Sequence, residues 1–160
     1  MSLVIVVGNP RTASRTRVAA EQLAADLSAD PPRVLDLAAL GPGAIGATEA
    51  TPAVSQAVQD AAGARLLLVA TPVYKASFTG LLKLFLDRFP PGGLDGAVAV
   101  PVLIGAAPAH LALADLQLRI VLAELGAALP APSLLVEERE LPAIADVTAS
   151  WVKRHGGRVA

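Results

Sequence analysis

Short apolar segments alternate with helical patterns along the whole chain. An unbroken apolar run of about four to eight residues, closed by a turn residue, is typical of a strand that is buried on both faces. Apolar residues spaced three and four positions apart indicate an amphipathic helix instead. The first pattern occurs at residues 3–7, 34–37, 66–70, 97–104 and 133–136, and the second at residues 18–27, 52–62, 80–88, 109–125 and 142–153.

This alternation predicts an α/β fold. Strands that alternate with helices form a parallel sheet covered on both faces, with right-handed crossovers. For five such strands we expect the flavodoxin-like, doubly wound order 2-1-3-4-5, whose switch point lies between the first and third strands. No repeat and no long linker divides the sequence, so residues 1–160 are predicted to form a single domain.

Proline and glycine mark the ends of the predicted elements. Thr71-Pro72 is expected to end the third strand, because proline has no amide hydrogen and restricts the residue before it. Residues 38–52 carry three glycines and two prolines, which predicts a loop without a regular element. Gly126 stands where a helix C′ glycine would. Residues 137–140 are expected to be an acidic surface run, and Gly156 to begin a frayed tail.

Composition excludes several classes of function. The formal net charge is −1 and the pI is about 6.1, which provides no basic surface for nucleic acid or anionic lipid. Cysteine is absent, so a disulfide framework and a thiolate metal site are both excluded. The apolar runs are too short to span a membrane, and no signal-peptide pattern precedes the first strand. We therefore expect a soluble, cytoplasmic protein.

Residues 8–17 (GNPRTASRTR) form a polar loop between the first strand and the first helix. A helix N-terminus offers free amide groups and the positive end of the helix dipole. Hydroxyl and guanidinium groups in this loop add the donors that suit a phosphate monoester. The loop has neither the GxxxxGK[ST] pattern nor the GxGxxG pattern, which disfavours a dinucleotide pyrophosphate. An ordinary capping loop, with Ser14 or Thr16 as the N-cap, is the alternative.

The loop after the third strand, PVYKASFTG at residues 72–80, is expected at the same edge of the sheet. Its amides could bond the polar edge of a planar heterocycle, while Tyr74 or an alkyl side chain covers part of the ring face. Lys75 would balance negative charge on a reduced ring or lie on the surface. Ser77 would contact the ligand or cap the next helix. Small residues at 105–108 leave room for a ring near the backbone.

The sequence lacks common catalytic motifs. Neither a nucleophile-elbow pattern nor an HExxH pattern occurs. The two histidines, His110 and His155, cannot form a metal cluster with a thiolate. A site without an obvious nucleophile or acid–base pair is typical of chemistry that a cofactor carries.

Three segments of the chain resemble one family. They are GNPRTASRT at residues 8–16, ATPVYKASFTGLLKLFLD at 70–87 and HLALADLQL at 110–118. They are similar to the NAD(P)H-dependent FMN reductases of the flavodoxin-like proteins, especially the alkanesulfonate-type flavin reductases. The middle segment is the specific one. This resemblance covers most of the chain and implies an enzyme that transfers a hydride from NADPH or NADH to FMN.

The resemblance also implies which residues bind the cofactor. In the family, the first loop holds the FMN phosphate, and the second holds the isoalloxazine and ribityl groups. The loop after the fourth strand also lines the flavin, and relatives commonly have paired glycines there. No catalytic side chain and no metal ligand is implied. The implied cofactor-binding residues are Asn9, Arg11, Ser14, Arg15, Thr16, Pro72, Val73, Tyr74, Lys75, Ser77, Gly105, Ala106 and Ala107.

Partners follow from the same resemblance. A two-component monooxygenase could receive the reduced FMN, and the family assembles as homodimers or homotetramers through the helices after strands three and four. The alternatives are an FMN-bound quinone or azo-type reductase, a flavodoxin-like electron carrier and a non-catalytic module without flavin. The apolar residues compatible with assembly in this chain are Leu81, Leu84, Phe85, Leu111, Leu118 and Val121.

Overall fold

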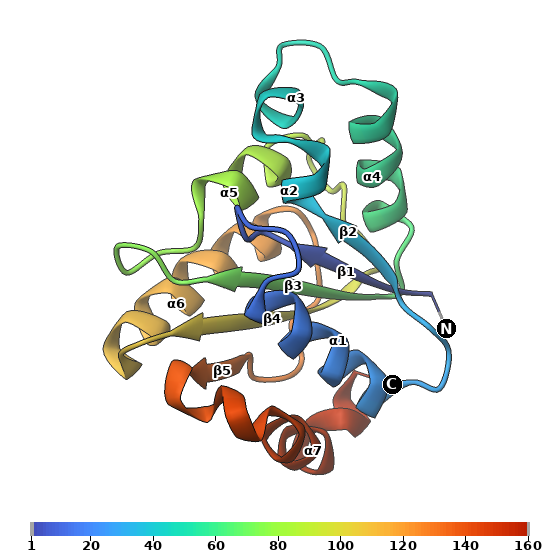
Figure 1. The fold of residues 1–160 in the computed structure, drawn as a ribbon. Coiled ribbons are helices and arrows are strands. Elements are labelled where there is room, and N and C mark those ends of the chain that lie inside the picture. Colours follow the sequence, from blue (N-terminus) through green and yellow to red (C-terminus); the bar gives the residue numbers. More distant parts are fainter. Residues whose placement is uncertain (1, 160) are drawn as a thin grey trace.

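A computed structural model describes residues 2–159 of the chain as a layered α/β structure. The five strands form one sheet in the order β2-β1-β3-β4-β5, and every neighbouring pair is parallel. This is the predicted flavodoxin-like order, which is confirmed (Figure 1). The strands are β1 (Leu3–Val7), β2 (Arg33–Asp36), β3 (Leu66–Pro72), β4 (Val98–Gly105) and β5 (Leu134–Glu137).

Helices cover both faces of the sheet, as the alternating pattern predicts (Figure 1). Alternate residues of each buried strand face opposite layers, so Leu3, Ile5 and Val7 of β1 pack into one core cluster and Val4 and Val6 into the other. None of the helices in residues 2–159 is both long and apolar enough to cross a membrane. One face carries α1 (Arg15–Leu27) and α7 (Ile144–His155); the other carries α4 (Pro52–Ala62), α5 (Gly80–Leu86) and α6 (Pro108–Glu124).

The prediction that residues 38–52 hold no regular element was wrong. Two short helices, α2 (Leu37–Leu40) and α3 (Pro42–Gly46), lie there. The side chain of Asp36 caps α2 by accepting the amide of Ala38 at 3.2 Å. The Arg88 guanidinium, which comes from beyond α5, donates to the carbonyl oxygens of Ile45 and Ala47. This contact joins residues that are far apart in sequence, so turn composition alone could not indicate it.

The third strand is longer than expected. It continues through Pro72, with Thr71 paired to Leu103 and Pro72 to Ile104. Proline removes one donor from the ladder but does not end it, because the next amide, that of Val73, donates to the carbonyl oxygen of Ile104 at 2.8 Å.

The C-terminal part also differs from the prediction. The acidic run begins a 3-10 helix, η1 (Glu138–Ala143), and α7 starts only after it. The expected frayed tail is instead a second 3-10 helix, η2 (Gly156–Arg158), followed by Val159, which is 3% exposed. Val159 packs in the same core cluster as Trp151 and residues of α1. Tertiary burial therefore orders a segment whose glycines favour flexibility.

Thr79 ties the loop after β1 to the start of α5. Its buried hydroxyl donates to the carbonyl oxygen of Gly8 at 2.5 Å and accepts the amide of Leu82 at 3.1 Å, as the N-cap of α5. Its own amide donates to the hydroxyl of Thr71 at 3.2 Å. A Cβ atom on Gly8 would lie 2.7 Å from the Cβ of Leu82. The first loop therefore lies directly on α5, and only glycine permits that approach.

We expect Thr79→Val to lower the free energy of unfolding by about 2–4 kcal/mol, because it removes a helix cap and leaves the buried Gly8 carbonyl without its donor. Thr79→Ser keeps the hydroxyl and should lose less than about 1 kcal/mol. Urea unfolding, followed through the fluorescence of the single tryptophan, Trp151, measures both. Equal losses in the two variants would contradict the role of the hydroxyl.

Candidate functional site

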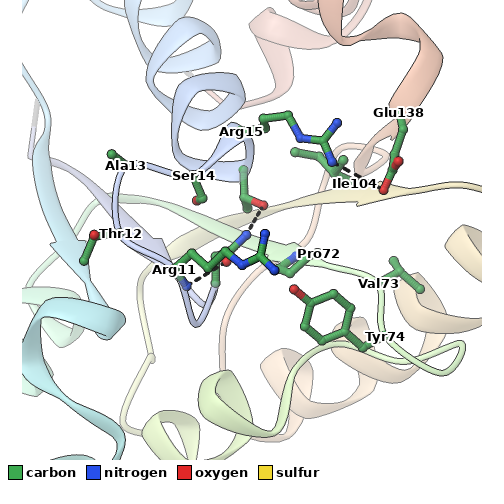
Figure 2. Close-up of a pocket in the computed structure, with 12 residues that line it drawn as sticks. Arg11, Thr12, Ala13, Ser14, Arg15, Pro72, Val73, Tyr74, Ile104 and Glu138 are labelled. Carbon is green, nitrogen blue, oxygen red and sulfur yellow. Dashed lines mark hydrogen bonds and ion pairs between the residues drawn. The ribbon is translucent and has the colours of Figure 1, made fainter.

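A cavity of about 290 Å³ lies where the loops after β1 and β3 meet, at the carboxyl edge of the sheet. This is the position at which doubly wound sheets bind ligands. Figure 2 shows Tyr74 of the second loop and the side chains of the first loop arranged around one space. The lining residues are Asn9, Arg11, Thr12, Ala13, Ser14, Arg15, Thr16, Pro72, Val73, Tyr74, Ile104 and Glu138.

Asn9 and Thr16 shape the first loop from inside. The side-chain oxygen of Asn9 accepts the amide of Arg11 at 2.9 Å, and its side-chain nitrogen donates to the hydroxyl oxygen of Thr16 at 3.0 Å. Both residues are buried, at 8% and 2% exposure. Both polar atoms of the Asn9 side-chain amide therefore bond to the protein itself, so we infer that Asn9 stabilises the conformation of the loop. The hydroxyl hydrogen of Thr16 remains available as a donor.

The first loop ends in a helix N-terminus with two nearby cations. Ser14 is the N-cap of α1, where its hydroxyl oxygen accepts the amide of Arg17 at 3.2 Å. The predicted capping role of Ser14 is thus present, whereas Thr16 lies within the helix. The first backbone bond of α1 runs from the Val18 amide to the Ser14 carbonyl, and the Arg17 amide bonds to the Ser14 hydroxyl. The amides of Arg15 and Thr16 come before both bonds. With Arg11 and Arg15 beside them, these amides form a site suited to an anion.

Two residues that line the cavity lie outside the two loops predicted to form it. Ile104, near the end of β4, adds an apolar side chain, which its place in a buried strand pattern did not indicate. Glu138 is exposed, as expected, and η1 also brings it to the cavity, where its Oε1 lies 3.7 Å from Nη2 of Arg15 (Figure 2). The position of η1 depends on how β5 and α7 pack, so no local motif could have indicated it.

A tight two-residue turn closes the second loop. Tyr74 and Ser77 exchange backbone hydrogen bonds of 2.9 and 3.1 Å, and both central residues have positive φ, 52° for Lys75 and 60° for Ala76. Positive φ at both central positions is the geometry of a type I′ turn, which favours glycine and asparagine. Each such non-glycine residue costs of the order of 1 kcal/mol, and strain of this kind gathers at functional sites.

Gln117 of α6 holds this turn in place. Its side-chain oxygen accepts the Ser77 hydroxyl at 2.6 Å, and its side-chain nitrogen donates to the Ala76 carbonyl oxygen at 3.3 Å. The hypothesis that Ser77 caps the next helix was wrong, because Thr79 is the N-cap of α5. Gln117 is a further residue that sequence reasoning missed, since nothing in a helical pattern indicates contact with a turn 40 residues away.

Five of the predicted site residues do not line this cavity. Lys75 occupies the turn itself, and Ser77 bonds to Gln117. Gly105 is closely packed, because a Cβ atom there would lie 3.2 Å from atoms of Val73 and Leu111. Its small size therefore serves packing in this structure. The five residues are Lys75, Ser77, Gly105, Ala106 and Ala107.

The charged side chains among the lining residues are two arginines and one carboxylate, which pairs with Arg15. Within residues 2–159, no group of three or more histidine, cysteine, aspartate or glutamate residues could hold a metal ion. The cavity therefore combines a site suited to an anion with apolar wall residues, Pro72, Val73 and Ile104. This arrangement suits a ligand that is both phosphorylated and ring-containing.

Comparison with known proteins agrees with the resemblance of the sequence. Residues 1–140 match the family model described as NADPH-dependent FMN reductase. A solved structure described as the apo form of an NADH:FMN oxidoreductase (EMOB) superimposes with a TM-score of 0.86 at 31% identity, and the match covers 99% of this chain and 90% of that one.

Curated relatives match over part of their length. An FMN reductase (NADPH) of Pseudomonas aeruginosa is 38% identical over 73% of this chain and 66% of its own. One of Escherichia coli strain K12 is 48% identical, over 38% of this chain and 32% of its own. The chain thus spans about one third to two thirds of these relatives. Because the family model covers most of the sequence, the chain belongs to the NADPH-dependent FMN reductase family.

Proposed function

We propose that this protein reduces FMN with NADPH or NADH. NAD(P)H and a proton would give NAD(P)⁺ as FMN becomes FMNH₂, so that two electrons and two hydrogens are transferred in all. The observation that carries this proposal is one cavity in which an anion site and an apolar wall meet at the switch point of a flavodoxin-like sheet. Membership of the family and the names of its relatives support it.

The first loop would hold the phosphate of FMN. The first-turn amides of α1 and the hydroxyl groups of Ser14 and Thr16 supply neutral donors, and Arg11 and Arg15 supply charge. This donor set fits a phosphate monoester. Thr12 also lines the cavity and adds a third hydroxyl group at its rim. Asn9 supports this binding indirectly, through its bonds to Arg11 and Thr16.

The second loop would hold the flavin ring. Pro72, Val73 and Ile104 provide an apolar surface, and Tyr74, which is 48% exposed, stands at its edge. Of the remaining predicted residues, Lys75 and Ser77 would shape the turn beside the ring. Gly105, at the end of β4, and Ala106 and Ala107, which follow it, would border the ring site without lining the cavity.

The chemistry at this site would come from the bound flavin, which accepts a hydride at N5. The described residues that line the cavity include no histidine, and their single carboxylate pairs with an arginine. We therefore assign no general acid or base to the protein. Its contribution is to orient the two reactants and to supply hydrogen bonds.

The reduced FMN would pass to a partner monooxygenase. We also propose that this protein is cytoplasmic. The names of relatives described as NADH-dependent FMN reductase SfnF and SfnE support NADH as well as NADPH as the reductant. The absence of cysteine is consistent with a reducing compartment.

We propose a homodimer or homotetramer that uses α6. Several residues expected at the interface are buried inside the molecule instead, namely Leu81, Phe85, Leu111 and Leu118. The large apolar side chains that α6 leaves exposed are Leu113, Leu116 and Ile120, at 50, 59 and 60% exposure. Their spacing places them along one stripe of the helix, and Leu84 of α5 is also exposed, at 43%.

The proposed activity is tested by anaerobic oxidation of NADPH and NADH with and without added FMN. We expect oxidation coupled to loss of the flavin absorbance. Arg15→Ala should weaken FMN binding by about 1–3 kcal/mol, because a charge-assisted contact with the phosphate is lost. Arg154→Ala, which removes an exposed arginine of α7 outside the cavity lining, should have little effect. A protein that binds FMN but oxidises neither nucleotide would refute the activity.

Gln117→Leu should weaken FMN binding roughly three- to tenfold, because two hydrogen bonds that hold the turn are lost. Ala76→Gly in the same protein should restore part of that affinity, since glycine adopts positive φ without strain. Fluorescence titration with FMN measures both variants. If Ala76→Gly gave no recovery, or if Gln117→Leu bound FMN normally, the turn would not depend on Gln117.

Ile120→Glu should shift the protein toward the monomer, because a charge would be buried in the proposed interface. Val18→Glu changes an equally exposed apolar residue on the opposite face of the sheet and serves as the control. Sedimentation equilibrium measures the mass of each variant. A wild-type monomer, or an oligomer unaffected by Ile120→Glu, would exclude this stripe as the interface.

A further inference from the structure

One side chain that lines the cavity carries a negative charge, which is unfavourable to binding of an anion. Glu138 lines the same cavity as the first loop, and its carboxylate lies 3.7 Å from the Arg15 guanidinium. Figure 2 shows this pair, with Arg15 at the start of α1 and Glu138 facing it from η1. A phosphate group that engages Arg15 must therefore share it with Glu138 or displace it.

The turn around Glu138 is fixed by its neighbours. Glu137 and Glu140 form a capping box, in which the Glu140 carboxylate accepts the amide of Glu137 at 2.8 Å. Arg139 pairs with the Glu137 carboxylate at 2.9 Å. These three side chains hold the start of η1, whereas Glu138 contacts the first loop through Arg15. The fold thus places the Glu138 carboxylate beside the anion site without using it as a cap.

The charges that line the cavity determine how Glu138 affects a bound phosphate dianion. The charged residues lining the cavity are Arg11, Arg15 and Glu138, so the carboxylate cancels one of two positive charges. Both members of the pair are partly exposed, 68% for the Arg15 side chain and 50% for that of Glu138. Water screens such charges, so the effect is modest. It is also specific, because a carboxylate repels a phosphate group but has little effect on an uncharged ring.

We propose that Glu138 is a specificity-determining residue that weakens binding of the phosphorylated flavin relative to the unphosphorylated one. The Glu138 carboxylate pairs with the Arg15 guanidinium when no phosphate is present, and it repels the phosphate group when one binds. This inference rests on the proposed function, since it concerns the same cavity. As a consequence, FMN dissociates more readily than it would from a site that had the two arginines and the helix N-terminus but no carboxylate.

The test compares the dissociation constants of FMN and riboflavin, measured by fluorescence titration, for the wild type, Glu138→Gln and Glu124→Gln. Glutamine keeps the size of Glu138 and removes its charge. Glu124 is an exposed carboxylate at the far end of α6, so its variant controls for the change in net charge. The Glu138 variant should bind FMN about three- to tenfold more tightly and riboflavin within twofold of the wild type. This gain should shrink at high salt.

An unchanged ratio of FMN to riboflavin affinity in Glu138→Gln would overturn the inference while leaving the proposed function intact. Weaker FMN binding would also overturn it, because Glu138 would then position Arg15 for the phosphate. A gain of equal size in Glu124→Gln would assign the effect to net charge. A wild type that binds neither flavin would instead refute the proposed function, and this inference with it.

Discussion

The adjacency of β1 and β3 is the constraint on which the rest of the structure depends. The chain crosses from β1 to β2 on one side of the sheet and returns to β3 on the other, so the loops after β1 and β3 leave the same edge side by side. The Thr79 hydroxyl then joins them through the Gly8 carbonyl. Because Gly8 has no side chain, the first loop approaches α5 closely enough for this bond.

This constraint gives the site its mixed chemistry. The first loop ends at a helix N-terminus, which suits an anion, whereas the second leaves a strand that is buried to its last residue. Neither loop alone forms a site for a phosphorylated ring compound. Together they supply both donors and apolar wall residues to one cavity.

Two features bear on how a flavin would bind. The turn of the second loop keeps Lys75 and Ala76 at positive φ and depends on Gln117 for support. Glu138 faces Arg15 at the first loop, and its charge is unfavourable to a bound phosphate. Under the proposed function, this opposing charge would favour release of the reduced flavin.

The sequence by itself determined the fold and most of the first loop. Buried strands and amphipathic helices have different periodicities, and Gly8, Ser14 and Pro72 mark the loops through their own backbone chemistry. Only the tertiary structure decided what contacts those loops: Glu138, Ile104 and Gln117 come from η1, β4 and α6. It also ordered α2, α3 and η2, against local composition. The reason is physical, since periodicity reports how each segment is buried, whereas these contacts depend on which segments the sheet order brings together.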